Sequence, residues 1–299
     1  MVNPVLKWAG GKRQLLDELY SRFPTEYQHY HEPFFGGGAV FFDLEPVDGT
    51  INDTNPRLVN FYEQVRDHPE DLIDLLRAFE DPESDPDSGK DHADEKNYYY
   101  QHRELFNRRP RDREHGELEE AALLLYLNRT CFNGLYRENS SGEFNVPIGR
   151  YADPDWVRSE QIRAASTVLN DTEIHNDDFE YVLNAAEERD LVYFDPPYQP
   201  MSPTANFAEY SADGFGKEDQ ERLLDTAKEL DEMGVYVVLS NSGVMYDFYD
   251  GEGFDVAVEG ATRSINSDAD NRDEVDEIIV TNVPEEKRDS SGQMKLGNY

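Results

Sequence analysis

The chain has 299 residues, of which 64 are Asp or Glu and 28 are Lys or Arg, so its formal charge at pH 7 is −36. Hydrophobic residues make up 37% and aromatic residues 12%, which is enough for a packed core and argues against intrinsic disorder. No run of 18 apolar residues and no signal-peptide pattern occurs, and the single cysteine, Cys131, excludes an intramolecular disulfide and a multi-cysteine metal site. We therefore expect a cytoplasmic protein without a metal ion or a membrane partner.

The charge is unevenly distributed, which matters for the choice of partner. Residues 103–163 carry ten Arg and eleven Asp or Glu, a net charge of −1 in a chain whose total is −36. Acidic residues concentrate instead in residues 81–95 and in the C-terminal third. Diffuse acidity with few lysines resembles proteins of halophilic organisms. Molar salt shortens the Debye length to about 3 Å, so general repulsion from DNA phosphates would be screened.

The first segment, residues 4–12, is a glycine turn that leads into a helix predicted at about 12–22. Lys12 suggests a phosphate loop, but Leu6 occupies the position of the first glycine and Arg13 that of the Ser or Thr. The segment is therefore either an ordinary helix N-terminus or one wall of a small-molecule pocket, with Trp8 beside Gly10.

A strand predicted at 29–35 is followed by Gly36-Gly37-Gly38 and an apolar helix, which is typical of a ligand-binding first βα turn. Phe41 stands where the dinucleotide fingerprint requires its third glycine. This weakens a nicotinamide cofactor and favours a nucleoside-type ligand without a pyrophosphate. A second strand at 50–52 ends at Asp53, which is placed to accept hydrogen bonds from ribose hydroxyls; helix capping by Asp53 or Asn55 is the alternative interpretation.

From about residue 57 to 156 the pattern changes to helices and loops, with helices predicted at 61–66, 72–79, 98–107 and 117–127 and an acidic loop at 81–95. Residues 128–137 and 142–151 then alternate Arg, Asn and aromatic residues around glycines. Such a mixture is suited to reading DNA, because Arg pairs with guanine, Asn pairs with adenine and aromatic rings insert between bases. A plain β-hairpin with exposed arginines is the alternative.

The α/β pattern resumes after this insert. Strands are predicted at 173–175, 191–194, 235–240, 254–259 and 274–283, a loop at 199–215 and an amphipathic helix at 217–233. The tail after Pro284 is polar, and we expect it to be loose.

The strand at 191–194 ends in Asp195-Pro196-Pro197-Tyr198. Proline lacks a donor N–H and restricts the residue before it, so Asp195 and the Pro196 carbonyl should face outward at the strand's carboxyl end. Ligands bind at that end in open α/β sheets. Two acceptors and the ring of Tyr198 would suit a planar group that bears an –NH2. A strand that leaves through a Pro-Pro turn with a surface tyrosine is the alternative.

These motifs occur in an order that resembles the Dam-type DNA adenine-N6 methyltransferases, the D12 class of the alpha group with a DPPY motif. The matching segments are 6–12 (LKWAGGK), 32–38 (EPFFGGG), 51–53 (IND), 128–129 (NR), 132–137 (FNGLYR), 142–147 (GEFNVP), 149–151 (GRY), 195–198 (DPPY), 204–207 (TANF), 240–241 (SN) and 263–265 (RSI). They span nearly the whole chain.

The resemblance implies an α/β fold with a Rossmann-like methyltransferase core, a mixed seven-stranded sheet and an inserted, mainly helical DNA-recognition domain. The core would comprise residues 1–56 and 157–284, the insert 57–156 and a polar tail 285–299. The implied reaction is methyl transfer from S-adenosylmethionine to N6 of a flipped-out adenine in double-stranded DNA, within GATC. A cognate restriction endonuclease is a candidate partner, and the enzyme would act as a monomer or weak dimer on DNA.

The resemblance also implies residue roles. Asp195, Pro196, Pro197 and Tyr198 would be catalytic: Asp195 and the Pro196 carbonyl would hold the adenine amine and Tyr198 would stack on the base. The cofactor residues would be Trp8, Gly10, Lys12, Phe35, Gly36, Gly38, Asp53, Asp178, Phe179 and Asp195. The DNA-binding residues would be Lys7, Arg129, Phe132, Asn133, Leu135, Arg137, Pro147 and Tyr151, with Arg137 reading a guanine. The family often has Tyr at the position of Phe132.

Four other readings remain at this point. N4-cytosine methylation and protein-glutamine methylation also use an –NH2 held by a similar tetrapeptide, but the motif order disfavours the first and the Arg- and Asn-rich insert the second. A non-catalytic DNA-binding protein of the same fold is disfavoured by the intact DPPY, Lys12 and Asp53. A nicotinamide oxidoreductase is disfavoured by Phe41. Cytosine-C5 methylation would need a cysteine nucleophile after a core strand, and Cys131 lies in the insert.

Overall fold

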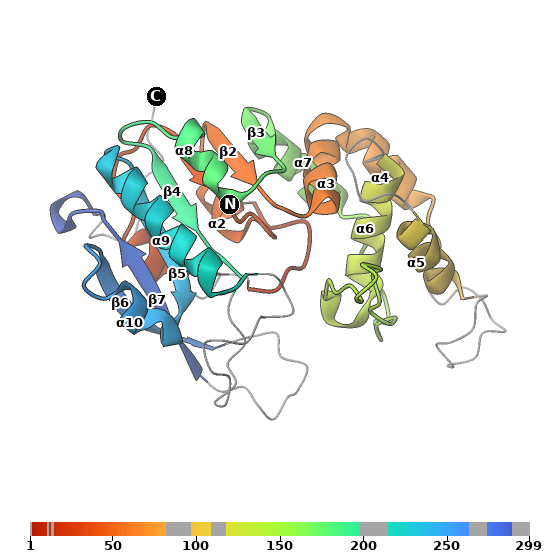
Figure 1. Cartoon of the computed structure of the whole chain (residues 1–299). Coiled ribbons are helices and arrows are strands. Elements are labelled where there is room, and N and C mark those ends of the chain that lie inside the picture. The colour runs from red at the N-terminus through yellow and green to blue at the C-terminus, as the bar shows by residue number, and fades with distance from the viewer. Residues whose placement is uncertain are drawn as a thin grey trace. The chain divides into compact units, whose positions relative to one another are not determined.

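The structure is a computed structural model of the whole chain (Figure 1). It describes residues 2–10, 12, 15–81, 97–108, 118–197, 215–262 and 274–288. Within these ranges no helix is both long and apolar enough to cross a membrane. The predictions that fall on Tyr198, on most of the loop at 199–215 and on residues 263–265 lie outside the described residues.

The chain divides into two compact units, which are described separately. Unit 1 comprises residues 1–11, 36–45 and 53–176, and unit 2 comprises residues 12–35, 46–52 and 177–299. The predicted division into a catalytic core and a recognition insert concerns function, and it stays a prediction. The unit boundaries differ from it, since residues 1–11 and 36–45 group with the helical region.

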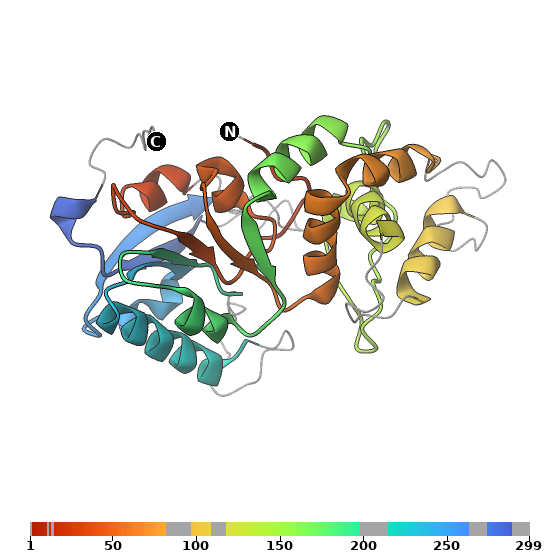
Figure 2. The same cartoon turned by 90° about the horizontal axis from the view of Figure 1, so that it is seen from above.

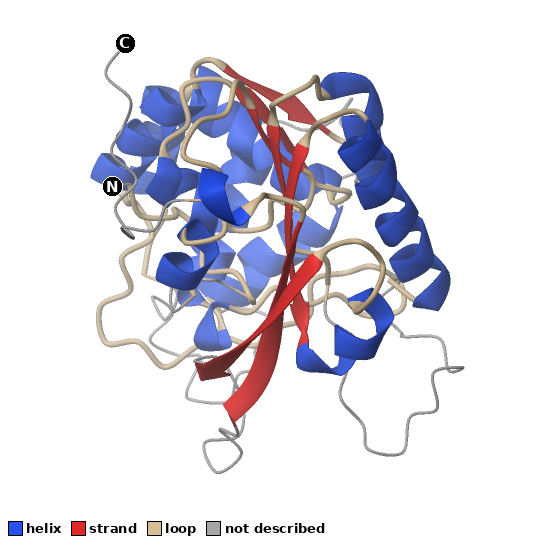
Figure 3. Cartoon of the chain, turned by 90° about the vertical axis from the view of Figure 1, so that its left-hand side faces the viewer, coloured by secondary structure: helices blue, strands red, loops and turns tan. Residues whose placement is uncertain are grey.

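The strands form one seven-stranded sheet with the order β3-β2-β1-β4-β5-β7-β6, so the predicted mixed sheet of a methyltransferase-like fold is confirmed. The strands are β1 (Tyr30–Glu32), β2 (Gly49–Asn52), β3 (Thr172–His175), β4 (Leu191–Phe194), β5 (Tyr236–Ser242), β6 (Asp255–Thr262) and β7 (Glu274–Thr281). Figure 3 shows the twist of the sheet, seen nearly edge-on.

The directions of the strands show where the ligand-binding edge of the sheet is expected in unit 2. β1 pairs in parallel with β2 and with β4, and β4 pairs in parallel with β5, whereas β7 is antiparallel to both β5 and β6. The chain runs outward from β1 to β2 on one side and resumes with β4 on the other, so the strand order reverses between β1 and β4. Ligands of open α/β sheets bind at the carboxyl ends of the strands at such a reversal. Asp195 follows β4 directly at this point.

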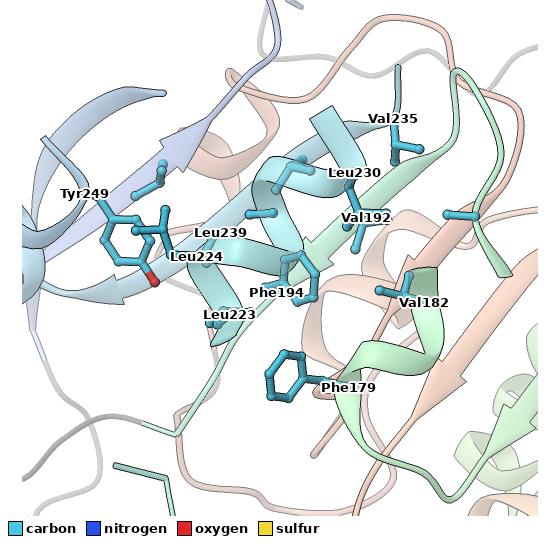
Figure 4. Close-up of a cluster of buried hydrophobic side chains, with 14 of the residues drawn as sticks. Phe179, Val182, Val192, Phe194, Leu223, Leu224, Leu230, Val235, Leu239 and Tyr249 are labelled. Carbon is cyan, nitrogen blue, oxygen red and sulfur yellow. The ribbon is translucent and has the colours of Figure 1, made fainter. Parts of the chain in front are cut away.

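Helices cover both faces of these strands (Figure 2). α8 (Val182–Ala185), α9 (Lys217–Glu232) and α10 (Tyr246–Tyr249) lie on one face and α1 (Leu16–Tyr20) on the other. Successive residues of a strand point to opposite faces. Val192 and Phe194 accordingly join the cluster under α9 that Figure 4 shows, whereas the ring of Tyr193 lies 6.1 Å from that of Phe23. Because both faces are covered, β4 and β5 are buried along their whole length.

Unit 1 is mainly helical. α2 (Ala39–Leu44) follows the glycine turn, and α3 (Pro56–Asp67), α4 (Pro69–Arg77), α5 (Tyr98–Arg108), α6 (Leu118–Thr130) and α7 (Ser159–Leu169) pack together. α6 is the central helix: it contacts α3, α4 and α5, and residues 120–128 are all buried. This burial explains why α6 has no amphipathic pattern, since a helix that is covered on all sides needs no polar face.

Most predicted elements are present, with small shifts at their ends. Three short 3₁₀ turns were not predicted, at Phe132–Gly134, Phe179–Tyr181 and Gly243–Met245, and neither were the helices α7, α8 and α10. The expectation that the tail after Pro284 is loose is wrong for residues 285–288. They form a further 3₁₀ turn, Glu285–Lys287, and Arg288 bridges to Pro24 and donates to Asp255 at 2.7 Å.

A buried carboxylate, Asp190, anchors the start of β4. Its Oδ1 accepts from the backbone N–H of His29 at 3.0 Å and from the ring Nδ1 of His29 at 3.1 Å. Its Oδ2 accepts from the Glu187 N–H at 2.8 Å and from Nε2 of His31 at 3.1 Å. Burial alone would raise the pKa of Asp190, but the hydrogen bonds from His31, Glu187 and His29 outweigh it and hold the pKa below its ordinary value.

Asp190→Asn is therefore expected to destabilise the protein by about 2–4 kcal/mol, because an amide in this place turns a donor toward buried N–H groups. A carboxylate with a lowered pKa stabilises the fold above its unfolded pKa of about 4, and this contribution is lost as the pH falls through the folded-state value. The deficit should be present at pH 7 and shrink in acid. Denaturant unfolding at both pH values measures it, with exposed Asp225→Asn on α9 as control. An equal deficit at all pH values would contradict the assignment.

Candidate active site

The site in unit 2 is built around the end of β4. β4 is an apolar strand, and it stops where two prolines cannot donate to the ladder. Pro196 is buried and Pro197 is exposed, while the side chain of Asp195 keeps 22% of its surface accessible. The structure thus brings Asp195, Pro196 and Pro197 to the predicted edge; Tyr198 lies outside the described residues.

Asp195 is held by one of its two carboxylate oxygens. Oδ1 lies 2.8 Å from Nζ of Lys12 and accepts from Oγ of Ser240 at 3.2 Å. The Ser240 hydroxyl is in turn 2.9 Å from the hydroxyl of Tyr193. Among the described residues Oδ2 has no hydrogen-bond partner, and the Pro196 carbonyl also accepts from none of them. Two acceptors are therefore available next to one another.

Lys12 balances the charge at this site. Its side chain is only 3% exposed, and its ammonium also lies 3.9 Å from Oε2 of the buried Glu277. Burial raises the pKa of Asp195, and the charge and hydrogen bond of Lys12, together with the hydrogen bond of Ser240, act against this rise. The net result is a pKa above the ordinary value, with Lys12 as the main group that limits the rise.

Asn52, at the end of β2, ties two further segments of unit 2 together. Its Nδ2 donates to the carbonyls of Pro33 and Asp177 at 3.0 Å each, and its Oδ1 accepts from the Asp177 N–H at 2.8 Å. Its backbone carbonyl accepts from Phe35, which is buried. The strand ends that carry Phe35 and Asp178 are thereby joined through one amide side chain.

Asp178 and Phe179 form a short corner after this clamp. The carboxylate of Asp178 caps the 3₁₀ turn Phe179–Tyr181 by accepting from the Glu180 N–H at 3.1 Å. The ring of Phe179 stacks on that of Phe34, with 5.3 Å between the ring centroids. Both residues are thus held in one conformation by local contacts.

In unit 1 the glycine turn is shaped by Trp8. Gly36 has φ +51°, and a Cβ built on it would lie 2.9 Å from Cδ1 of the indole. A side chain at Gly36 would therefore both strain the backbone and clash with Trp8. Gly38 caps α2 with φ +65°, and Gly10 has φ +83°. The structure brings Trp8 and Gly36 together, which favours the pocket-wall interpretation of this segment.

Asp53 lies against the same turn. Its Oδ2 accepts from the Gly36 N–H at 3.0 Å and its Oδ1 from the Asn55 N–H at 2.8 Å. Burial raises the pKa of Asp53, although both backbone hydrogen bonds lower it. Helix capping falls to Asn55, whose Oδ1 accepts from the N–H of Arg57 at the start of α3. Asp53 does not cap the helix, and its carboxylate instead fixes the glycine turn.

The predicted DNA-binding residues of unit 1 gather around the end of α6. Asn128 accepts from the Lys7 N–H at 2.8 Å and donates to the carbonyls of Lys7 and Gly134 at 2.8 and 3.1 Å. The ammonium of Lys7 lies 4.6 Å from the ring centroid of Tyr151. Burial, Arg129 and Arg158 lower the pKa of Lys7, which indicates an electropositive neighbourhood.

The turn after α6 exposes aromatic side chains. Phe132 and Tyr151 are 41% and 38% exposed, and Asn133 has its backbone in the left-handed region at φ +56°. The Phe132 N–H donates to the Pro147 carbonyl at 2.8 Å, and the Leu135 N–H donates to the Phe132 carbonyl. Exposed rings on a tightly bonded turn are suited to contact with bases.

Arg137 and Arg129 are oriented by single contacts. Nε of Arg137 donates to Oδ1 of Asn145 at 2.7 Å, and Nε of Arg129 donates to the Asp155 carbonyl at 3.2 Å. Two bridges, Cys131 to Ile148 and Glu138 to Phe144, join the two predicted segments as an irregular hairpin. The segments thus form a hairpin, as the alternative interpretation predicted, and the DNA-reading role of their side chains stays a prediction.

Comparison with known proteins decides the family. A family model described as D12 class N6 adenine-specific DNA methyltransferase matches residues 8–267. The chain belongs to this family.

Similar proteins cover nearly the whole methyltransferase. The Type II methyltransferase M1.LlaDCHI of Lactococcus lactis subsp. cremoris is 43% identical over 285 residues, 94% of this chain and 95% of that protein. The Type II methyltransferase M.MjaIII of Methanocaldococcus jannaschii is 38% identical over 293 residues, 94% and 99% of the two chains. The DNA adenine methylase of Escherichia coli K12 is 33% identical over 279 residues, 93% and 95%.

The enzyme is accordingly an adenine-specific DNA methyltransferase. The cytosine, protein, nicotinamide and non-catalytic alternatives are not retained. Two residues of this methyltransferase contact the site in ways that sequence reasoning did not assign, Asn52 and Glu277. Asn52 could have been found as a polar residue at a strand end. Glu277 could not, because its place beside Lys12 depends on the pairing of β7 with β5, where it lies opposite Ser242.

Proposed function

We propose that this enzyme transfers the methyl group of S-adenosylmethionine to N6 of an adenine that is flipped out of duplex DNA, within GATC. The observation that carries the proposal is the Asp195 carboxylate, whose Oδ1 is held by Lys12 and Ser240 while Oδ2 has no described partner. An oriented acceptor beside the Pro196 carbonyl suits a group with two N–H hydrogens, which is what the adenine amine offers.

The chemistry follows from these acceptors. The exocyclic amine of adenine is a poor nucleophile because its lone pair is delocalised into the ring. When Asp195 and the Pro196 carbonyl accept hydrogen bonds from its two N–H groups, a pyramidal nitrogen with a localised lone pair is favoured. The carboxylate also stabilises the positive charge that develops on nitrogen. S-adenosylmethionine supplies an electrophilic methyl group on a sulfonium sulfur. By resemblance to the family, Tyr198 stacks on the flipped base.

A covalent enzyme intermediate is not needed for this reaction. The thiol of Cys131 is buried, and burial raises its pKa to about 12, so it is protonated at neutral pH and is not a nucleophile. Cys131 also belongs to unit 1, at the end of α6, whereas Asp195 belongs to unit 2. Direct transfer from sulfur to nitrogen is therefore the mechanism that the residues support.

The residues present fit the cofactor in each unit. In unit 1, Gly36 lets the indole of Trp8 lie directly against the turn, where a Cβ would clash, and the acidic Asp53 holds this turn through the Gly36 N–H. In unit 2, Asp178 and Phe179 offer an acid and a ring for a nucleoside base, and the ring of Phe179 stacks on Phe34. We assign Trp8, Gly10, Lys12, Phe35, Gly36, Gly38, Asp53, Asp178, Phe179 and Asp195 to the cofactor on this basis and on the family resemblance.

Recognition of DNA is assigned to the turn and hairpin after α6. Arg137 projects from the hairpin with its guanidinium oriented by Asn145, and it is the candidate for bidentate contact with the guanine of GATC. Lys7, Arg129, Phe132, Asn133, Leu135, Pro147 and Tyr151 are its proposed companions. Two of the similar proteins bear the name Type II methyltransferase. A restriction endonuclease with the same recognition sequence is the partner that we infer from these names.

Methyl transfer from labelled S-adenosylmethionine to duplexes with and without GATC, in molar salt, tests the proposal. We expect label on adenine N6 within GATC alone. Arg137→Ala should lower kcat/KM on GATC by roughly 10–100-fold and relax the preference for its guanine, since a bidentate base contact is worth about 1–3 kcal/mol.

Arg77→Ala is the matched control, because Arg77 is an exposed arginine on α4 that forms an ion pair with Asp74. It should leave both activity and sequence preference unchanged. Label on another sequence would refute GATC and the assignment of Arg137 while retaining the chemistry. Binding of the cofactor without transfer to any DNA would refute the proposed substrate.

A further inference from the structure

Arg222, on α9, contacts three consecutive residues of unit 2 that include two proposed cofactor residues. Its Nη2 lies 2.8 Å from Oδ1 of Asp178 and 2.9 Å from Oε2 of Glu180, and its Nε donates to Oε1 of Glu180 at 3.1 Å. Its guanidinium carbon lies 4.9 Å from the ring centroid of Phe179, between those two acids in sequence. One side chain thus holds residues 178, 179 and 180.

The position of Arg222 on α9 is also fixed by its neighbours in that helix. Nη1 donates to Oδ1 of Asp219 at 3.2 Å, and Oδ2 of Asp219 accepts from Gly216 at the start of α9. The next residue, Leu223, is fully buried under the sheet, so the backbone of Arg222 is fixed by the core. A single exposed ion pair adds little to the stability of a fold, because solvent and salt screen it. Fold stability alone therefore does not explain why the guanidinium of Arg222 makes a bidentate contact with Glu180 and also pairs with the carboxylates of Asp178 and Asp219.

The contacts of Arg222 decide what Asp178 and Phe179 present. Oδ1 of Asp178 is occupied by Arg222 and by the Glu180 N–H, whereas Oδ2 has no partner among the described residues. The Phe179 backbone N–H likewise has no acceptor there. The ring of Phe179 contacts both Arg222 and Phe34, which fixes it. A fixed acceptor and a fixed donor thus stand one residue apart.

This pair matches one edge of adenine. Adenine presents a donor at N6 and an acceptor at N1, side by side, so the carboxylate of Asp178 can accept from N6 and the Phe179 N–H can donate to N1. Hypoxanthine, with a carbonyl at C6 and a hydrogen on N1, presents the opposite pattern. The difference in affinity between the two bases therefore distinguishes an oriented Asp178 from one that is free to rotate.

We propose that Arg222 is a positioning residue that sets the selectivity of the cofactor site for adenine, by orienting the carboxylate of Asp178 and the ring of Phe179. The inference rests on the proposed function, which assigns Asp178 and Phe179 to the cofactor. It adds a residue that touches neither cofactor nor substrate and acts through these two.

The test compares two ligands on the wild type and on four variants of the full chain. Wild type should bind S-adenosylhomocysteine at least about tenfold more tightly than S-inosylhomocysteine, measured by calorimetry, because mismatched hydrogen-bond groups are left unpaired. Arg222→Gln should reduce this ratio about tenfold and raise the KM for S-adenosylmethionine with kcat unchanged. Arg222→Lys keeps the charge without the bidentate geometry, so its ratio should be intermediate. Lys217→Gln, on the same helix and paired with Glu221 at 3.2 Å, should behave as wild type.

Two results would overturn the inference while leaving the proposed function intact. One is an Arg222→Gln variant that binds both ligands as wild type does, and the other is one that loses affinity for both equally, which indicates a structural role only. An Asp178→Asn variant with the wild-type ratio would also overturn it. Failure of the wild type to bind either ligand would instead refute the cofactor assignment itself, so the two failures are distinguishable.

Discussion

Asp195→Asn is expected to lower kcat for adenine methylation by about 10²–10³-fold, the usual cost of removing one preorganised electrostatic group from a transition state. The amide can still accept from Lys12 and Ser240 with its oxygen, but its –NH2 then occupies the position of Oδ2. Two amines would face each other, and the positive charge that develops on N6 would lose the carboxylate. Affinity for DNA should change little, because the proposed DNA contacts lie in unit 1.

Single-turnover methylation of a GATC duplex measures the effect, with DNA binding and thermal unfolding as parallel readouts. The matched control is Asp225→Asn, the same substitution at an exposed position of α9. A variant at Asp195 that methylates within about threefold of wild type would exclude the carboxylate from the reaction. A variant that fails to unfold cooperatively would instead place Asp195 among the structural residues, which its partly exposed side chain argues against.

Lys12→Gln is expected to shift the acidic limb of the pH–activity profile to higher pH. Burial raises the pKa of Asp195 and Lys12 opposes it, so removal of the cation lets the pKa rise further. The reaction needs Asp195 as an ionised acceptor. Activity should therefore fall most at low pH and recover partly as the pH is raised. A simple loss of fold would instead lower activity at every pH.

The profile of kcat/KM between pH 5 and 9 measures this shift. Glu277→Gln is the control, because it keeps the charge of Lys12 beside Asp195 and changes only the acid 3.9 Å from Lys12 on its other side. It should not move the limb to higher pH. A Lys12→Gln variant that loses activity by the same factor at every pH would refute the electrostatic role, and it would leave Lys12 with a function in binding or packing.

Local chemistry explains why the sequence was informative about the site. An apolar run of four residues followed by two prolines predicts both a buried strand and its end, and β4 ends where Pro196 and Pro197 remove the backbone donors. Gly36 and Gly38 have positive φ, a conformation that local sterics disfavour for residues with a Cβ. The glycines themselves therefore predict the turn. Such features depend on neighbours in the chain, so the strand ends, the glycine turn and the family motifs could all be predicted without a structure.

The recognition region was less predictable, since its elements are defined by burial. α7 was missed, and α6 was shortened to residues 117–127, although it continues to Thr130. A helix that is buried on all sides has no amphipathic period to mark its ends. The alternation of Arg, Asn and aromatic residues after α6 predicted a reading surface, but only the bridges from Cys131 to Ile148 and from Glu138 to Phe144 show how its two segments pair.

The sequence by itself determined the class of enzyme and the strand that leads into Asp195, and it predicted the acceptors that we propose for the reaction. Tertiary structure alone decided which groups surround them. Lys12 reaches Asp195 across 183 positions of the chain, Glu277 joins them through the register of β7 on β5, and Arg222 meets Asp178 across 44 positions. Such pairs depend on the order and register of the strands. These are fixed by the packing of the whole core, which no local pattern encodes.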